Sequence, residues 1–239
     1  MNNTPYHYLS LVYSHLMKSI DYNSWADYII DISYHYNKKA NNILELASGN
    51  CLISEKLSGE FNNILLTDNS ISMLTNNSVP LKKICCDMTL LPFKNKFDLI
   101  FSTFDSINYL IEKVSLKKLF NEVKRVLSKD GIFTFDVSLE KNSTKNLRRL
   151  NRKGKYNGIK YIQKSEYDKK EKIHYNFFEL TLESGEKIKE IHKQRIYDFE
   201  EYFEIIYNCD LIVRDCFDAF TFDDASNKCE RVQFIVMRE

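Results

Sequence analysis

Two acidic residues, Glu45 and Asp68, each end a short apolar run in the stretch ILELASGNCLISEKLSGEFNNILLTD. Between them lie a turn of small residues, from Ala47 to Gly49, and a segment with helical periodicity. This order of apolar run, turn, helix and second apolar run is typical of a βαβ nucleotide-binding unit. Small side chains let backbone N–H groups approach a ligand, and a carboxylate ending the second strand can hold a ribose diol through two hydrogen bonds.

The same stretch resembles the first motif of the class I S-adenosylmethionine-dependent methyltransferases, in which an acidic residue is followed by glycines at alternate positions. The corresponding residues here are Glu45, Ala47, Gly49 and Cys51. Cys51 replaces the last glycine, and its Cβ would cost roughly 1–2 kcal/mol if that position requires a left-handed backbone. On this loop alone, a generic dinucleotide-binding unit remains the alternative.

The resemblance implies contacts with S-adenosylmethionine from several loops. Asp68 would hold the ribose, while Asp87 would bind the adenine amino group and Met88 would lie against the ring. The DYNSWADYI segment resembles a pattern in which Tyr13 and Trp25 close over the methionine end of the cofactor. The full set of expected cofactor contacts is Tyr13, Trp25, Glu45, Ala47, Ser48, Gly49, Asp68, Asn69, Met73, Asp87, Met88, Thr103 and Phe104.

The segment FDLIFSTFDSINYL, residues 97–110, begins with nearly continuous apolar residues bounded by charge. This pattern predicts a strand buried on both faces, at the centre of a parallel sheet. The chain then becomes polar at the strand's carboxyl end, where open α/β sheets bind their ligands. The D-S-x-N-Y run resembles a small-molecule subgroup of the family, which implies that Asp105, Asn108 and Tyr109 face the methyl acceptor. The alternative is a helix cap at Asp105 or Ser106, with Tyr109 as ordinary packing.

Three strand-like runs follow at 159–167, 172–182 and 187–197, and turn residues separate them. They predict an antiparallel meander, which in the resembling subgroup is an inserted lid over the acceptor. Its candidates for substrate contact are His174, His192, Arg195 and Tyr197. A hydroxyl acceptor would need a base, for which the candidates are His192, Tyr109 and Asp105. An amine acceptor needs only to be neutral and correctly placed.

The remaining periodicities complete an α/β architecture. Residues 6–37 predict two helices joined near 21–23, with Ser24 as a cap, and 115–127 predicts an amphipathic helix. A buried strand is expected at 82–86, a turn at 129–131, a strand at 132–137, and a helix at 199–208 followed by strands at 211–216 and 231–238. The expected fold is a seven-stranded Rossmann-like sheet, mostly parallel with one antiparallel strand and helices on both faces, plus a small antiparallel insertion. We expect a core of residues 1–138 and 198–239 with an N-terminal helical cap, and a lid of residues 139–197.

Composition narrows the class of protein. A formal net charge of +1 argues against a strongly basic nucleic-acid binder, and no run is long enough to span a membrane. The N-terminal MNNTPYHY lacks a signal-peptide pattern, so we expect a cytoplasmic protein. We also expect it to be a monomer or a homodimer. Six cysteines lack the spacing of zinc or redox motifs, which predicts reduced thiols and no metal site.

The sequence therefore predicts methyl transfer from S-adenosylmethionine to nitrogen or oxygen of a small molecule. One alternative is a binding protein that has lost transfer because of Cys51. Another is an RNA methyltransferase that uses the basic segment 145–155 for phosphate contacts, although a solvated helix and loop would have the same composition. The basic residues of this segment are Lys145, Arg148, Arg149, Arg152, Lys153 and Lys155.

Overall fold

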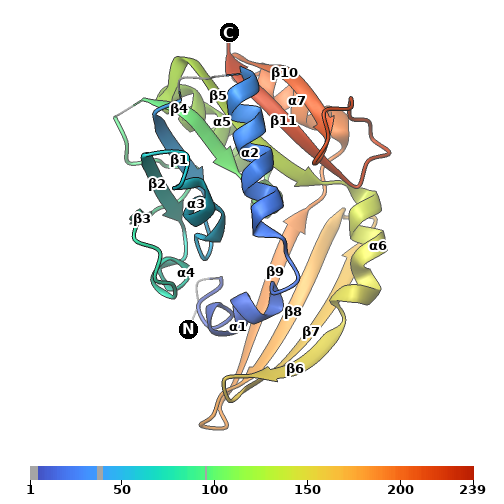
Figure 1. Ribbon diagram of the computed structural model, residues 1–239. Coiled ribbons are helices and arrows are strands. Elements are labelled where there is room, and N and C mark those ends of the chain that lie inside the picture. Colours follow the sequence, from blue (N-terminus) through green and yellow to red (C-terminus); the bar gives the residue numbers. More distant parts are fainter. Residues whose placement is uncertain (1–4, 37–39, 95) are drawn as a thin grey trace.

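Two β-sheets form the framework of the computed structural model, which describes residues 5–36, 40–94 and 96–239 (Figure 1). The large sheet has the order β10-β11-β5-β4-β1-β2-β3, and the small sheet has the order β6-β7-β8-β9. The strands of the large sheet are β1 (Asn42–Leu46), β2 (Asn63–Asp68), β3 (Lys82–Cys85), β4 (Phe97–Ser102), β5 (Leu127–Ser138), β10 (Leu211–Asp218) and β11 (Arg231–Arg238). Those of the small sheet are β6 (Arg152–Tyr156), β7 (Ile159–Asp168), β8 (Ile173–Thr181) and β9 (Lys187–Arg195).

The large sheet is mixed, as the sequence predicts. β1 pairs in parallel with both β2 and β4, β2 pairs in parallel with β3, and β4 pairs in parallel with β5. β11 is antiparallel to both of its neighbours, β5 and β10. The predicted fold class is therefore confirmed. The strand order reverses direction between β1 and β4, and open α/β sheets bind ligands at such a point.

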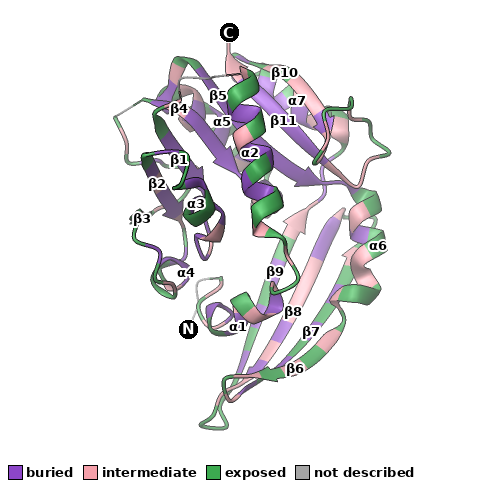
Figure 2. Ribbon diagram, viewed as in Figure 1, coloured by how far each residue is buried: buried purple, intermediate pink, exposed green. Residues whose placement is uncertain are grey.

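Helices cover both faces of the large sheet because successive strand residues point to opposite sides. Ile43 of β1 packs in a cluster with residues of α2 (Tyr22–Tyr36) and α3 (Leu52–Leu57). Its neighbour Leu44 packs on the other face with α5 (Lys113–Val126) and α7 (Phe199–Tyr207). The central strands are accordingly buried along their length (Figure 2). The remaining helices are α1 (Ser10–Leu16), α4 (Ile71–Thr75), the 3-10 helix η1 (Ser106–Tyr109) and α6 (Glu140–Leu150).

The small sheet buries one face under the N-terminal segment. Leu9, Val12 and Leu16 pack against inward-facing residues of the small sheet, among them Tyr161 and Leu180. In β7 buried and exposed residues alternate, as a strand with one solvated face requires. The predicted cap is thus split, because α1 packs on the small sheet whereas α2 packs on the large one. The proposed division into a core and a lid remains a prediction.

Several local predictions were wrong. The strand at 82–86 is not buried, because β3 is the edge strand of the sheet and Ile84 is exposed. The turn at 129–131 lies inside β5, where the pairing with β4 shifts register between Leu127 and Ile132. A fourth strand of the small sheet, β6, was not predicted.

The two N-terminal helices were predicted correctly in number, although the first begins only at Ser10. Asp21, rather than Ser24, caps the second helix, because its carboxylate accepts the backbone N–H groups of Asn23 and Ser24 and also the Ser24 hydroxyl. Residue 37, the last of the predicted helical segment, lies outside the described residues. Among the described residues, no helix is both long enough and apolar enough to cross a membrane.

Asn108 joins the two sheets at the end of β5. Its Nδ2 donates to the backbone carbonyl of Arg195, at the end of β9, over 2.7 Å, and to that of Ser138 over 3.3 Å. Its Oδ1 accepts the backbone N–H of Ser138 over 3.0 Å. The Asn108 side chain is fully buried, so these hydrogen bonds are shielded from water. Asn108 therefore links the end of β9 to the end of β5 through hydrogen bonds to backbone groups.

We expect Asn108→Ala to lower the free energy of unfolding by about 2–4 kcal/mol, because it leaves buried donors and acceptors without partners. Urea denaturation monitored by circular dichroism measures this loss. The matched control is Asn62→Ala, at an exposed loop position, for which a change within about 0.5 kcal/mol is expected. A loss at Asn108 as small as that of the control would contradict the structural role.

Candidate active site

A cavity of about 270 Å³ lies at the carboxyl ends of the parallel strands of the large sheet. The loops after β1, β2, β3 and β4 all contribute to its wall, and the N-terminal segment adds Tyr6 and Tyr13. Twelve of the residues predicted to contact a cofactor line it. They are Tyr13, Glu45, Ala47, Ser48, Gly49, Asp68, Asn69, Met73, Asp87, Met88, Thr103 and Phe104.

In the loop between β1 and α3, every second residue from Ala47 to Cys51 has a left-handed backbone conformation. Ala47, Gly49 and Cys51 have φ values of 52°, 54° and 63°. Two of these three residues carry a Cβ, so the loop holds roughly 1–2 kcal/mol of strain at each of them. The Cys51 side chain is fully buried in the cluster with α2 and α3, with its Sγ 3.8 Å from Ser48 Oγ, and it is not part of the cavity wall. The replacement of glycine by Cys51 therefore leaves the cavity open.

Asp68 ties the first two loops together. Its Oδ2 accepts the Gly49 N–H over 2.8 Å, and its Oδ1 accepts the Ser70 N–H over 2.7 Å. Burial raises the pKa of this carboxyl, and the hydrogen bonds from backbone N–H groups oppose that rise. Each carboxylate oxygen keeps a second lone pair. Asp68 can therefore accept two further hydrogen bonds from a ligand in the cavity, as a vicinal diol would provide.

Glu45 is a buried carboxyl in the wall of the same cavity, only 1% exposed. The Ser54 hydroxyl donates a hydrogen bond to its Oε2 over 2.5 Å. Burial raises the pKa of Glu45 to about 8, the Ser54 hydrogen bond opposes the rise, and the nearby Asp68 charge adds to it. In the protein alone Glu45 is therefore mostly protonated at neutral pH. A cation bound beside it would favour loss of this proton.

A second cavity, of about 360 Å³, lies between the large and small sheets. Four aromatic residues belong to the walls of both cavities: Tyr6, Tyr13, Phe104 and Tyr109. The hydroxyls of Tyr6 and Tyr109 are 2.5 Å apart, which fixes two of these rings relative to each other. The two cavities thus adjoin across this aromatic wall.

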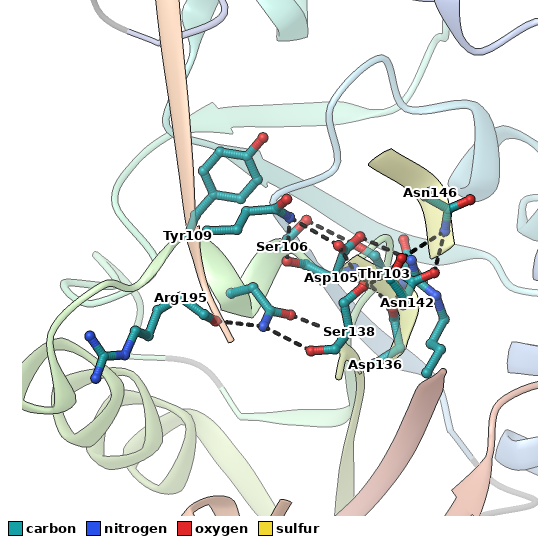
Figure 3. Close-up of polar contacts among 12 residues, drawn as sticks. Thr103, Asp105, Ser106, Tyr109, Asp136, Ser138, Asn142, Asn146 and Arg195 are labelled. Carbon is teal, nitrogen blue, oxygen red and sulfur yellow. Dashed lines mark hydrogen bonds and ion pairs between the residues drawn. The ribbon is translucent and has the colours of Figure 1, made fainter. Parts of the chain in front are cut away.

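A network of polar side chains lines the second cavity around Asp105 (Figure 3). The Asp105 Oδ2 accepts hydrogen bonds from Ser138 Oγ over 2.8 Å and from Gln194 Nε2 over 3.0 Å. Its Oδ1 pairs with Arg231 Nη2 over 3.2 Å, and Arg231 also pairs with the buried Asp136. Burial raises the pKa of Asp136 to about 6, while the Arg231 charge opposes the rise. Arg231 is therefore neutralised by carboxylates of the core.

Glu190 of β9 holds the N-terminal segment against this site. Its Oε1 accepts the backbone N–H groups of Tyr8 and Leu9, over 2.7 and 3.0 Å, and its Oε2 accepts that of Tyr6 over 3.0 Å. His192 Nε2 lies 3.2 Å from the same Oε2, and the His192 ring packs against the ring of Tyr6. The small sheet therefore positions Tyr6, which belongs to both cavities.

Comparison with known proteins identifies the family. Residues 43–131 match a family model described as a methyltransferase domain. The chain is 30% identical over 233 residues to a Bacillus subtilis protein named "Putative methyltransferase YqeM", and the alignment covers 93% of both chains. The chain belongs to the methyltransferase family.

Solved structures agree with this assignment at the level of the fold. A crystal structure of an S-adenosylmethionine-dependent methyltransferase from Clostridium acetobutylicum has a TM-score of 0.79 and 24% identity, covering 98% of this chain and 99% of that one. The sugar N-methyltransferase KedS8 from Streptoalloteichus has a TM-score of 0.74 and 14% identity, covering 94% and 91%. The predicted class I S-adenosylmethionine-dependent methyltransferase is confirmed.

Not every residue predicted for the site of this methyltransferase lines a cavity. Trp25 lies in the core instead, where its ring packs on Phe104 with a centroid distance of 4.6 Å. Asn108 is a buried structural residue, and the buried Tyr197 donates its hydroxyl proton to backbone carbonyls of residues 110 and 111. Arg195 contributes its backbone carbonyl to Asn108, and its side chain points away from the polar cluster (Figure 3).

Asp105, Tyr109 and His174 do line the second cavity of the methyltransferase. His174 Nε2 lies 2.6 Å from Ser165 Oγ, and burial lowers the pKa of this imidazole. His192 is 2% exposed and lines neither cavity. Contacts of any of these residues with a ligand remain predictions.

Sequence reasoning missed residues that the methyltransferase brings to its cavities from distant segments. Tyr6, Gln163, Gln194 and Arg231 line the second cavity, yet none belongs to a recognised motif. One signal was available for Arg231, because it is a charged residue at the start of a mostly apolar strand, RVQFIVMR. Gln163 and Gln194 required knowledge of which face of the small sheet is turned inward, and Tyr6 required knowledge of where the N-terminal segment packs.

The raised pKa of Glu45 makes the stability of the methyltransferase depend on pH. The stabilisation from the protonated carboxyl is present below the ordinary pKa of 4.5 and is lost as the pH rises through about 8. Compared with Glu45→Gln, the free energy of unfolding of the wild type should fall by a few kcal/mol between pH 5 and 8, since each pH unit in this window is worth up to about 1.4 kcal/mol. Urea denaturation at a series of pH values measures this difference.

The control is Glu55→Gln, an exposed glutamate in the same helix as Ser54. Its stability should follow that of the wild type across the whole pH range. Parallel curves for the wild type and Glu45→Gln would show that Glu45 titrates in its ordinary range.

Proposed function

We propose that this methyltransferase transfers the methyl group of S-adenosylmethionine to an amine nitrogen of a small molecule. The observation that carries the proposal is the pair of cavities that share the wall formed by Tyr6, Tyr13, Phe104 and Tyr109. The sulfonium of the cofactor makes its methyl group electrophilic. The protein then has to align sulfur, methyl and acceptor at that wall and to exclude water.

The first cavity suits the cofactor, which is S-adenosylmethionine. Asp68 has lone pairs available for the two ribose hydroxyls. Asp87 and Met88, after β3, would take the adenine. Glu45 and the loop from Ala47 to Gly49 would lie nearer the methionine portion, whose α-ammonium group would favour the ionised form of Glu45.

The three residues predicted as bases for a hydroxyl acceptor are poorly suited to that role, which favours nitrogen as the acceptor atom. Burial raises the pKa of Tyr109 far above neutrality, so its phenol is not a base at physiological pH. His192 lines neither cavity, and Asp105 is committed to Arg231, Ser138 and Gln194. A neutral amine can attack the sulfonium without a base, whereas a hydroxyl cannot readily do so. The structural likeness to a sugar N-methyltransferase agrees with this choice.

The alternatives have less support. Loss of transfer through Cys51 would require its side chain to obstruct the cavity, and the thiol is turned into the core. For RNA binding, part of the basic segment is already engaged, since Lys145 pairs with Glu230 and Arg152 binds Gln163 and the carbonyl of Leu16. The cytoplasmic location and the monomeric or dimeric state expected from the sequence remain predictions.

We expect Asp68→Ala to weaken binding of S-adenosylmethionine by ~1–3 kcal/mol, because buried polar partners on the ligand and in the loop lose their acceptor. Calorimetric titration measures the change. The control Asp31→Ala removes an exposed carboxylate on α2 and should leave the affinity unchanged. Equal affinities for the wild type and Asp68→Ala would remove Asp68 from the cofactor site.

The reaction itself is tested with a panel of small primary amines and matched alcohols, and with RNA as a separate acceptor. Conversion of S-adenosylmethionine to S-adenosylhomocysteine is followed by mass spectrometry. Turnover should occur with amines and increase with pH until the amine is fully deprotonated. Turnover restricted to alcohols would refute the choice of nitrogen, and turnover restricted to RNA would refute the small-molecule acceptor.

A further inference from the structure

One face of α6 is turned into the second cavity. Asn142, Asn146 and Arg149 follow a spacing of four and three residues, which places them on one side of a helix, and all three line the cavity. Asn146 Nδ2 donates to Asn142 Oδ1 over 2.6 Å, and Asn142 Nδ2 donates to Ser138 Oγ over 2.7 Å (Figure 3). Arg148 and Arg149 are both exposed, but only Arg149 is part of the cavity wall. The two neighbouring arginines therefore differ in their position relative to the cavity, and not in their exposure.

Arg152, just after α6, is a second arginine in the same wall. Its Nε donates to Gln163 Oε1 over 2.8 Å and its Nη1 donates to the carbonyl of Leu16 over 3.0 Å. These bonds hold the guanidinium in place, and its Nη2 makes no hydrogen bond with any residue that the structure describes. Burial lowers the pKa of Arg152, the Tyr161 phenol opposes this fall, and the charge of Arg149 adds to it.

The Asp105 carboxylate in this cavity does not neutralise the charges of Arg149 and Arg152. Asp105 is the only acidic residue among those described in its wall, and it pairs with Arg231. Within residues 5–36, 40–94 and 96–239, neither Arg149 nor Arg152 makes an ion pair with a carboxylate. A cavity wall with two uncompensated guanidinium groups is suited to an anion, which each can bind by charge-assisted hydrogen bonds.

We propose that Arg149 and Arg152 bind an anionic group, a phosphate or a carboxylate, of the methyl acceptor. The inference rests on the proposed function in so far as the bound molecule is the acceptor. Asn142 lies beside the Asp105 network, and Arg149 lies seven residues further along α6. At a rise of about 1.5 Å per residue this is on the order of 10 Å. The anionic group of the acceptor would therefore bind at a distance from the Asp105 network, toward the C-terminal end of α6.

The anion site is tested on the full chain by thermal unfolding with increasing inorganic phosphate, pyrophosphate or succinate. Sodium chloride keeps the ionic strength constant, which removes general screening effects. In the wild type we expect at least one of these anions to raise the unfolding midpoint saturably. In Arg149→Gln the apparent dissociation constant should rise at least tenfold. Preference for the phosphates would indicate a phosphorylated acceptor, and preference for succinate a carboxylate.

The matched control is Arg148→Gln, which removes an equal charge from the neighbouring position outside the cavity. Its dissociation constant should stay within twofold of the wild type. Arg152 is a poorer primary variant, because its bonds to Leu16 and Gln163 also support the fold. No saturable binding of any of the three anions, or equal weakening in Arg148→Gln and Arg149→Gln, would overturn the proposal.

A separate calorimetric titration with S-adenosylmethionine distinguishes failure of this inference from failure of the proposed function. Arg149→Gln should bind the cofactor as the wild type does, because Arg149 is not part of the first cavity. Absence of cofactor binding in the wild type would refute the methyltransferase activity while leaving the anion site intact. Cofactor binding without anion binding would refute the anion site alone.

Discussion

Parallel pairing of β1 with β2 on one side and β4 on the other is the constraint on which both cavities depend. It aligns Glu45 with Leu66 and with Phe101, so that the loops after three strands emerge at the same edge of the sheet. Because the strand order reverses at β1 and β4, the helices after these strands diverge and leave space between them. The strand register thus sets where the wall of the first cavity lies. The left-handed residues after β1 and the Asp68 carboxylate then set its detailed shape.

The two sheets contribute differently to the site. The large sheet supplies backbone N–H groups and carboxylates in short loops, which suits a ligand that carries hydroxyl and ammonium groups. The small sheet and α6 supply amides and guanidinium groups on long regular elements. The aromatic rings of Tyr6, Tyr13, Phe104 and Tyr109 separate these polar environments. Asp68 on the cofactor side and Asp105 on the acceptor side both lie near enough to this wall to raise the pKa values of Tyr13 and Tyr109, where burial is the larger cause.

Features that depend on neighbouring residues were predictable from the sequence, and those that depend on distant ones were not. Glu45 and Asp68 were identified because apolar runs and small residues surround them in the chain. The partner of Asp105 was not, since Arg231 lies far away in the sequence. β6 was missed because its residues, RKGKY, carry almost no apolar alternation, and it forms only by pairing with β7. His192 was interpreted as a possible base because strand periodicity cannot show that Tyr6 and Glu190 enclose it.

The hydrogen bonds of Glu190 connect the small sheet to the N-terminal segment. A single carboxylate on β9 holds the backbone of Tyr6, Tyr8 and Leu9, and Tyr6 takes part in the walls of both cavities. Any displacement of β9 that kept these hydrogen bonds would carry the Tyr6 backbone with it, so the walls of both cavities would move together.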